Sequence, residues 1–377
     1  MIKILARYAE IGLKGKNRIV FEKQLIKNIS QQLNIKPSQV NISQKQIFIT
    51  VSDSLINQSV KNLAKVFGLA WFAPVTEVKT DLSDISKATI LLAKTQKASS
   101  FAIRASRINK TITFNSQDIA IKVGDQVRKT LDLKVDLTNP ALEIYIVANK
   151  DTTYLFTQKI SGVGGLPVGT SGKVLCLLSG GFDSIAASYL LAKRGAEVDF
   201  LHFHVFNDQK KVLNSKIKHI IDQLSQYTLS TNLYLASYTP YQMVILDLPN
   251  RQQKQELVVF RRLMVKVGQE LAKKHGYQAL VLGDSLGQVA SQTMENIVAV
   301  DQAVNIPIFR PLIGMDKKDI IDLVRQIGLE KETEKPYKDC CSIISKAPST
   351  KANLEKVEEI EEDINIDKIV QEIIQNI

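Results

Sequence analysis

The residues with the clearest potential for chemistry form one short stretch, Ser179-Gly-Gly-Phe-Asp-Ser184. Two hydroxyls, two glycines and a carboxylate stand here between an apolar run, residues 174–178, and a helical pattern, residues 185–194, that stops at Gly195. The run predicts a buried parallel strand, and the glycine is a typical helix terminator. A strand, a tight turn of small residues and a helix start together direct backbone N–H groups at one spot, which is a common way to bind phosphate. We therefore expect a phosphate site at this turn.

The spacing excludes two common nucleotide loops. A Walker loop needs a lysine after its glycines, and a dinucleotide fingerprint needs a third glycine; the stretch has neither. The order Ser-Gly-Gly-x-Asp-Ser instead resembles the PP-loop of ATP pyrophosphatases, which cleave ATP between its α- and β-phosphates and leave an adenylate. There the hydroxyls and glycines would wrap pyrophosphate, while Asp183 would hold Mg²⁺ or orient the α-phosphate. The alternative is an ordinary Gly-Gly turn between a strand and a helix.

The chain has three cysteines, and their surroundings predict different roles. Cys176 falls inside the expected buried strand and would be a core residue. Cys340 and Cys341 follow Pro336-Tyr-Lys-Asp339 in a polar loop, where a thiol is reachable and nearby lysines would favour its thiolate form. Adjacent cysteines rarely bond to each other, and the sequence offers no second Cys or His pair at zinc-ligand spacing. So few cysteines make no disulfide framework, which favours a reducing, cytoplasmic environment.

The elements that must position these groups alternate through the carboxy-terminal half. Apolar strands are separated by helical patterns, which predicts a doubly wound parallel sheet. The expected strands are residues 173–178, 196–203, 232–237 and 279–282. Ligands of such sheets lie beyond the carboxyl ends of the strands. The Ser-Gly-Gly turn, His202-Phe203 and a polar run that starts at Gly283 all fall there.

Polar side chains near the strand ends are candidate nucleotide ligands. Gly283 permits close approach of the backbone, and it is followed by amide and hydroxyl side chains. These are Gln288, Ser291, Gln292 and Thr293. On a long helix from about residue 252, either Arg261 or Arg262 would reach a phosphate bidentately, and the helical period does not decide between them. For the polar run, an N-capped helix rich in small residues is the alternative.

The 377-residue chain has a net charge of +11 that is unevenly distributed. Residues 1–172 hold 24 Lys and Arg against 12 Asp and Glu, whereas the remainder holds 25 against 26. Such asymmetry favours a polyanion-binding module joined to a nearly neutral catalytic one. A lysine-rich composition without any nucleic-acid role is the alternative. No apolar run is long enough to span a membrane, and the amino terminus is charged too early for a secretory signal.

The basic half is predicted to hold α/β units with a positive face. A ferredoxin-like α/β sandwich of this kind suits RNA, which is read through its shape and phosphates. The RNA-binding candidates are Lys14, Lys16 and Arg18 on a turn at residues 10–18, and Arg104 and Arg107 on a strand at residues 101–107. Taken alone, the turn is better explained as a solvated basic loop.

Three further motifs complete a family resemblance. They are Phe101-x-Ile-Arg-Ala-x-Arg107, Lys134-Val-Asp-Leu-Thr-Asn-Pro140 and Gly164-Gly165-Leu-Pro167-x-Gly169, and they are similar to a THUMP domain and its exit. THUMP domains accompany tRNA-modifying enzymes. Together with the 10–18 turn and the PP-loop in this order, they make the chain resemble the tRNA 4-thiouridine synthetase (ThiI) family up to about residue 350. Two departures, Ala9 for the usual Gly and Ile185 for the usual Pro, remove no reacting group.

The resemblance implies an α/β fold in three parts. These are a ferredoxin-like domain at residues 1–68, a THUMP RNA-binding domain at 69–160 and, after a glycine-rich linker at 161–172, a doubly wound PP-loop domain at 173–377 with an acidic helical tail. The linker is either a hinge or a tight crossover.

The family's site residues carry over to matching positions. Those that would contact the nucleotide are Leu177, Leu178, Ser179, Gly180, Gly181, Ser184, His202, Phe203, Arg261, Gly283 and Gln292. Of these, His202 and Phe203 would flank the adenine, through backbone contacts by analogy with the family. The residues implied in the reaction itself are Asp183 and, of the adjacent cysteines, Cys341.

The implied function is ATP- and Mg²⁺-dependent sulfur transfer to tRNA. A uridine at position eight would be adenylated on its carbon-four oxygen and would then receive sulfur, giving 4-thiouridine. Some family members continue into a rhodanese domain with a persulfide cysteine, whereas residues 354–377 here are an acidic helical pattern without cysteine. We therefore expect a cysteine desulfurase or another persulfide carrier to supply sulfur. Some family members also supply sulfur for thiazole synthesis in thiamine biosynthesis, usually through the rhodanese part, and the sequence leaves that role open.

Two other functions stay open from the sequence. One is a different adenylating PP-loop ligase that acts on RNA or a small molecule, and the other is a non-enzymatic RNA-binding protein. A homodimer is also left open.

Overall fold

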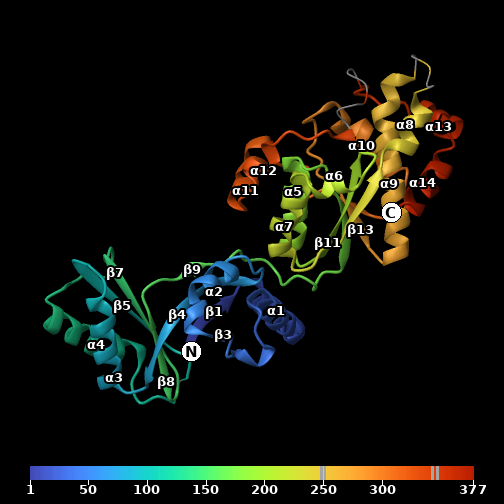
Figure 1. Cartoon of the computed structure of the whole chain (residues 1–377). Helices are drawn as coiled ribbons and strands as arrows, with labels where there is room; N and C mark the ends of the chain where they lie inside the picture. Colours follow the sequence, from blue (N-terminus) through green and yellow to red (C-terminus); the bar gives the residue numbers. More distant parts are fainter. Residues whose placement is uncertain (110, 247–248, 250–251, 341–343, 345–347) are drawn as a thin grey trace. The chain divides into compact units, whose positions relative to one another are not determined.

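The structure is a computed structural model that describes the chain except for residues 110, 247–248, 250–251, 341–343 and 345–347. The chain divides into two compact units, Met1–Pro167 and Val168–Ile377 (Figure 1). None of the helices in the described ranges combines the length and apolarity needed to cross a membrane.

The first unit is built on one long sheet with helices packed against it. Its elements are β1 (Ile2–Tyr8), α1 (Arg18–Leu33), β2 (Val40–Ser43), β3 (Gln46–Val51), α2 (Ile56–Leu63), β4 (Leu69–Lys79), α3 (Leu82–Lys94), β5 (Ser100–Arg107), α4 (Ser116–Leu131), β6 (Lys134–Val135), β7 (Leu142–Ala148), β8 (Thr152–Phe156) and β9 (Ile160–Ser161). The strand order is β2-β3-β1-β4-β8-β7-β5-β6, with β9 beside β4. Apolar residues four apart on α1, such as Leu25 and Ile29, are fully buried, as the helical period requires.

Strand β4 joins the two halves of this sheet. Its residues Leu69–Val75 pair with β1, and Thr76–Lys79 pair with β8, all antiparallel. One eleven-residue strand therefore belongs at once to the half of the sheet that holds β1–β3 and to the half that holds β5–β8.

The second unit is a parallel sheet wrapped by helices. Its elements are β10 (Lys173–Leu177), α5 (Phe182–Lys193), β11 (Glu197–His204), α6 (Lys210–Leu213), α7 (Lys216–Thr228), β12 (Leu233–Ser237), α8 (Thr239–Ile245), α9 (Glu256–His275), β13 (Ala279–Val281), α10 (Met294–Asp301), β14 (Ile308–Phe309), α11 (Lys317–Gln326), α12 (Glu330–Glu334), α13 (Leu354–Asp363) and α14 (Ile366–Gln375). Every pairing between these strands is parallel, in the order β12-β11-β10-β13-β14. The predicted doubly wound sheet is confirmed.

The acidic carboxy-terminal segment packs against the rest of this unit. Helices α13 and α14 place Val357, Ile360, Ile369 and Ile373 in the same core cluster as α9. Burial of these aliphatic side chains is the main stabilising term for such a segment, so residues 354–375 are part of the folded unit.

Candidate functional site

The predicted phosphate loop lies at the topological switch point of the parallel sheet. It joins the central strand β10 to α5, and the chain on either side of β10 winds outward to β11 and β13 (Figure 1). The loop is braced internally, because Ser179 Oγ lies 3.2 Å from Ser184 Oγ and accepts from the Gly181 N–H at 3.2 Å. The loop therefore holds the backbone N–H groups of the first turn of α5 in a fixed orientation, with no helical partner for them.

Two glycines allow this frame to pack closely. Gly180 has φ +79°, and a Cβ there would lie 2.6 Å from Ile217 Cδ1 on α7. A Cβ on Gly283 would lie 2.6–2.8 Å from backbone atoms of Asp183 and Ser184. The chain leaving β13 thus crosses directly over the start of α5, which only glycine permits.

The Asp183 carboxylate faces two groups from distant parts of the chain. Lys317 Nζ donates to both of its oxygens at 2.8 and 3.0 Å, and Gln288 Nε2 donates at 3.1 Å. Lys317 is the first residue of α11, and it was missed from the sequence. The available signal was Asp316, an N-cap residue directly before a lysine and beyond the last strand.

A cavity of about 200 Å³ opens beside the loop. It is lined by Leu177, Ser179, Asp183, Ser184, Leu257, Arg261, Met264, Val265, Leu282, Gly283, Asp284, Ser291 and Gln292. The structure therefore brings together seven predicted site residues: Leu177, Ser179, Asp183, Ser184, Arg261, Gly283 and Gln292. The other predicted nucleotide residues, Leu178, Gly180, Gly181, His202 and Phe203, are not among those that line it.

The structure also decides between the two arginines of α9. Arg261 enters the cavity, where it donates to both oxygens of Asp284 at 2.7 and 2.9 Å and to the Ser291 carbonyl. Arg262 is buried on a different side of the helix, in a bidentate pair with Glu361 of α13 at 2.7 and 2.9 Å. Arg261, the one that the family resemblance favoured, is thus the arginine available to a phosphate.

Asp284 is the central carboxylate of a network of ion pairs that the sequence did not reveal. Its carboxylate also accepts from Arg310 at 2.9 Å, and Arg310 in turn donates to Asp301. Burial alone would raise the pKa of Asp284, but the two guanidinium groups outweigh burial and hold that pKa below its usual value. The buried carboxylate is therefore ionised and fixes the direction of Arg261.

His202 and Phe203 are side chains of the core. His202 is 1% exposed; its Nδ1 lies 2.7 Å from the Leu178 carbonyl and its Nε2 2.8 Å from the Tyr337 hydroxyl. Phe203 packs edge-on against Phe260. The side chains therefore do not line the cavity, and the backbone contacts with a nucleotide that the family resemblance implies stay a prediction.

The cysteines differ from one another in what the structure describes. Cys176 is fully buried, and burial raises the pKa of its thiol, so the predicted core role is confirmed. Cys340 is only 1% exposed, which contradicts the expectation of a reachable thiol at that position, because Cys340 packs into the core cluster of α9. Cys341 lies outside the described residues.

The basic residues predicted to bind RNA in the first unit differ in the contacts that their side chains already make. On the 10–18 turn, Lys16 is exposed, Lys14 Nζ lies 4.8 Å from the Phe21 ring centre and Arg18 donates to the Gly12 carbonyl. Arg107 donates to the Ile112 and Phe114 carbonyls and so holds its own loop. Arg104 bonds Glu143 at 2.8 Å while both side chains remain more than a third exposed.

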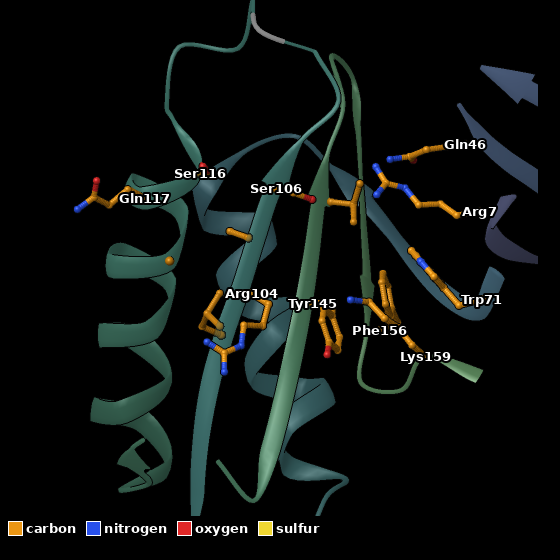
Figure 2. Close-up of a pocket in the computed structure, with 14 residues that line it drawn as sticks. Arg7, Gln46, Trp71, Arg104, Ser106, Ser116, Gln117, Tyr145, Phe156 and Lys159 are labelled. Carbon is orange, nitrogen blue, oxygen red and sulfur yellow. The ribbon is translucent and has the colours of Figure 1, made fainter. Parts of the chain in front are cut away.

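Arg104 belongs to a hollow of about 690 Å³ on the sheet of the first unit (Figure 2). Figure 2 shows Trp71, Tyr145 and Phe156 gathered there from three strands, with Lys159 from the loop that follows β8. The Tyr145 and Phe156 rings are stacked at 5.0 Å, and Lys159 Nζ lies 3.8 Å from the Tyr145 ring centre. Aromatic rings interleaved with cations bind unpaired RNA bases and their phosphates.

Most of the hollow was missed from the sequence. Arg7, Trp71, Tyr145, Phe156 and Lys159 were not singled out, although they line the same face. The usable signal was strand periodicity, because side chains two apart on a strand share one face of a sheet.

Three family models match the chain in consecutive segments. "ThiI ferredoxin-like domain" matches residues 3–73, "THUMP domain" matches 79–158, and "Thiamine biosynthesis protein (ThiI)" matches 169–366. A "Probable tRNA sulfurtransferase" of Thermoanaerobacter pseudethanolicus is 37% identical over 372 residues, which cover 98% of this chain and 97% of the relative. One of Clostridium kluyveri is 36% identical and covers 98% and 97%.

A solved structure is similar over the whole chain. It is described as a 4-thiouridine synthetase in complex with RNA and bound ATP. The TM-score is 0.89 at 28% sequence identity, and the match covers 100% of this chain and 98% of the other.

Proposed function

This chain belongs to the ThiI family of tRNA sulfurtransferases, as its motifs predicted, and from that premise we propose that it uses ATP to convert a tRNA uridine to 4-thiouridine. The observation that carries the proposal is the Ser179–Ser184 loop, set at the sheet's switch point beside a cavity that holds Asp183 and Arg261. The solved relative described with RNA and ATP supports both substrates.

The first step activates the uridine. Its carbon-four oxygen attacks the α-phosphorus of ATP, the bond to the bridging oxygen breaks, and pyrophosphate leaves. The N–H groups at the start of α5 would hold the departing charge, and Arg261, fixed by Asp284, would add a bidentate contact. Activation is necessary because an amide-like oxygen is a very poor leaving group, whereas AMP is a good one.

Mg²⁺ is expected to accompany ATP. It binds through one or two carboxylates together with substrate phosphates, and Asp183, at the mouth of the phosphate loop, fits that requirement. The described residues hold no cluster of three or more acidic, His or Cys side chains suited to a metal. Bound there, the ion would neutralise phosphate charge, while Lys317 and Gln288 keep the carboxylate oriented.

The second step replaces the activated oxygen. The terminal sulfur of a cysteine persulfide, loaded by a cysteine desulfurase or another carrier, attacks carbon four and expels AMP, which leaves the uridine sulfur in a disulfide with that cysteine. A second thiol then attacks the cysteine sulfur, forms a disulfide with it and releases 4-thiouridine, so the two thiols supply the two electrons. Cys341 is our candidate, either as the cysteine whose persulfide attacks the adenylate or as the thiol that resolves the persulfide sulfur.

The first unit would supply the RNA. We propose that residues 1–68 and 69–160 hold tRNA, through the turn that carries Lys14, Lys16 and Arg18 and through the hollow around Arg104. Arg107 contributes by shaping its loop. Shape and phosphate contacts of this kind position an RNA without reading much sequence.

The test is ATP-dependent thiolation by purified protein. Unmodified tRNA, Mg²⁺, ATP and a persulfide-loaded cysteine desulfurase are incubated with the protein, and nucleosides are analysed by mass spectrometry. Asp183→Ala should abolish 4-thiouridine while tRNA binding is retained, whereas Asp222→Ala, which removes an exposed carboxylate that also pairs with a lysine, should not. Thiolation that persists in Asp183→Ala contradicts the proposal, and ATP turnover with a small acceptor alone would favour a different ligase.

A further inference from the structure

A series of hydrogen bonds joins the phosphate loop to Tyr337. This residue precedes Cys340 and Cys341, and residues 336–341 are called the cysteine segment below. The carbonyl of Leu178, directly before Ser179, lies 2.7 Å from His202 Nδ1 at the end of β11. The Nε2 of the same ring lies 2.8 Å from the hydroxyl of Tyr337. Tyr337 stands three residues before Cys340 in sequence.

The direction of this chain is fixed by chemistry. A carbonyl oxygen can only accept, so Nδ1 of His202 carries the hydrogen. Burial lowers the pKa of His202 to about 4, which leaves the ring neutral at pH 7 and its Nε2 without a hydrogen. Tyr337 therefore donates to His202, and His202 donates to the carbonyl of Leu178.

A second link joins the same two regions. Lys216, the first residue of α7, donates from Nζ to the Thr333 carbonyl at 2.8 Å and lies 6.0 Å from the Tyr337 ring centre. Its Cε would lie 3.4 Å from a Cβ on Gly180. The ring of Phe206 also packs edge-on against Tyr337 at 5.8 Å. The backbone before the cysteines is thus held to the phosphate loop at two points.

The links lie apart from the groups expected to activate the uridine. None of His202, Tyr337 and Lys216 is among the residues that line the cavity of Arg261 and Asp183. A change in the links should therefore alter the placement of the cysteine segment more than the chemistry at the α-phosphorus.

We propose that Tyr337 is a positioning residue for sulfur transfer, which acts through His202 to keep the cysteine segment in register with the nucleotide loop. The inference rests on the proposed function and assigns its two steps to different residues. The residues that line the cavity carry out adenylation, and the transfer of sulfur from a cysteine depends on the hydrogen bond between Tyr337 and His202.

The test compares two products in single-turnover reactions with enzyme in excess over tRNA. Tyr337→Phe removes one hydroxyl and keeps the ring that contacts Phe206. Pyrophosphate release should stay within about threefold of the wild type, while 4-thiouridine formed per pyrophosphate should fall about tenfold, the size of one lost buried hydrogen bond. Free sulfide attacks the adenylate without the cysteine segment, so replacing the persulfide donor by sodium sulfide should restore the ratio.

Matched variants separate positioning from folding. Tyr234→Phe removes a hydroxyl that bonds Tyr277 on another part of the sheet, and its ratio should equal that of the wild type. Lys216→Met, which cuts the second link, should lower the ratio in the same direction even if Tyr337→Phe proves unstable. An equal loss of both products, or no rescue by sulfide, would overturn the inference. A wild-type protein that forms neither product would instead contradict the proposed function.

Discussion

Two arginine–carboxylate pairs have nearly equal distances but differ in how exposed their side chains are. Arg261 and Asp284 meet at 2.7 Å with 12% and 5% of their side chains exposed, whereas Arg104 and Glu143 meet at 2.8 Å with 37% and 36% exposed. A buried pair costs desolvation and becomes strongly destabilising when one partner is lost, whereas an exposed pair contributes little. The same contact is therefore a rigid support in the second unit, residues 168–377, and an exchangeable one in the hollow around Arg104.

This difference agrees with what each region has to do. The cavity beside the phosphate loop must present Arg261 at one place, and its direction is set by Asp284 and then by Arg310 and Asp301. In the proposed function the hollow contacts RNA, and a cation whose present partner is solvated can exchange that partner for a phosphate.

The largest effect is expected from removing the buried charge. Asp284→Asn removes the buried carboxylate that accepts from both Arg261 and Arg310 and leaves Arg261 without a charged partner among the described residues, so the free energy of unfolding of the second unit should fall by about 3 kcal/mol. The kcat/KM for ATP should drop about 100-fold, because misplacing a phosphate contact by an ångström has that order of effect. Denaturant unfolding and pyrophosphate release measure the two quantities.

Glu143→Gln is the counterpart at the exposed pair. If both variants lost similar stability, burial would not be the property that distinguishes the two regions.

Acid should also affect the two units differently. All four histidines lie in the nucleotide unit, and burial lowers the pKa of His202 to about 4 and lowers that of His204 as well. Below pH 6.5 the histidines of the unfolded chain become protonated, whereas the buried histidines of the folded unit stay neutral. The free energy of unfolding therefore decreases as the pH falls from 6.5 towards 4. The loss from His202 reaches about 3 kcal/mol at the lower end.

The single tryptophan allows the two units to be followed separately. Trp71 lies in the first unit, so its fluorescence reports that unit, while far-UV circular dichroism reports both. Lowering the pH from 7 to 5 should shift the unfolding of the second unit, which circular dichroism detects and Trp71 fluorescence does not, to lower denaturant concentration. His219→Gln, at an exposed position, should leave this shift unchanged. A Trp71 transition that shifts equally would contradict the assignment to the buried histidines.

A smaller effect is expected in the hollow. Trp71→Ala should weaken tRNA binding about tenfold, since stacking of one base on an aromatic ring is worth about 1–3 kcal/mol. Pyrophosphate release at saturating tRNA should not change. Leu91→Ala, which truncates an exposed apolar side chain on α3, is the control. Unchanged tRNA affinity in Trp71→Ala would exclude the hollow as an RNA contact.

How far the sequence predicted each region follows from how each is encoded. The phosphate loop is contiguous, and the requirements of a tight turn at a helix start are local, so Ser179 to Ser184 and the parallel sheet were predictable. Lys317 lies 134 residues from Asp183, and Arg310 lies 26 residues from Asp284. Such contacts depend on how helices return to the sheet, and single-sequence patterns do not carry that information.

The hollow was hidden for a different reason. Its side chains come from β1, β3, β4, β5, β7, β8, α4 and the loop that follows β8, and each strand taken alone shows only ordinary alternation. The arrangement appears once strand order is known, because β4 brings Trp71 beside the strands that hold Tyr145 and Phe156. Net charge drew attention to this half of the chain but not to a face of its sheet.

The smallest and most direct test of the comparison is Glu143→Gln itself. The change removes the charge that holds Arg104 but keeps a side chain of the same shape, so the free energy of unfolding should change by less than about 1 kcal/mol. Arg104 then has one fewer competitor for a phosphate, and tRNA affinity at low salt should rise by about twofold. Because one more cation engages phosphate, the dependence of affinity on salt should steepen by up to about one unit of slope. Arg104→Gln should shift both quantities in the opposite direction, and a loss of affinity in Glu143→Gln would mean that the pair supports the hollow rigidly, as Asp284 supports Arg261.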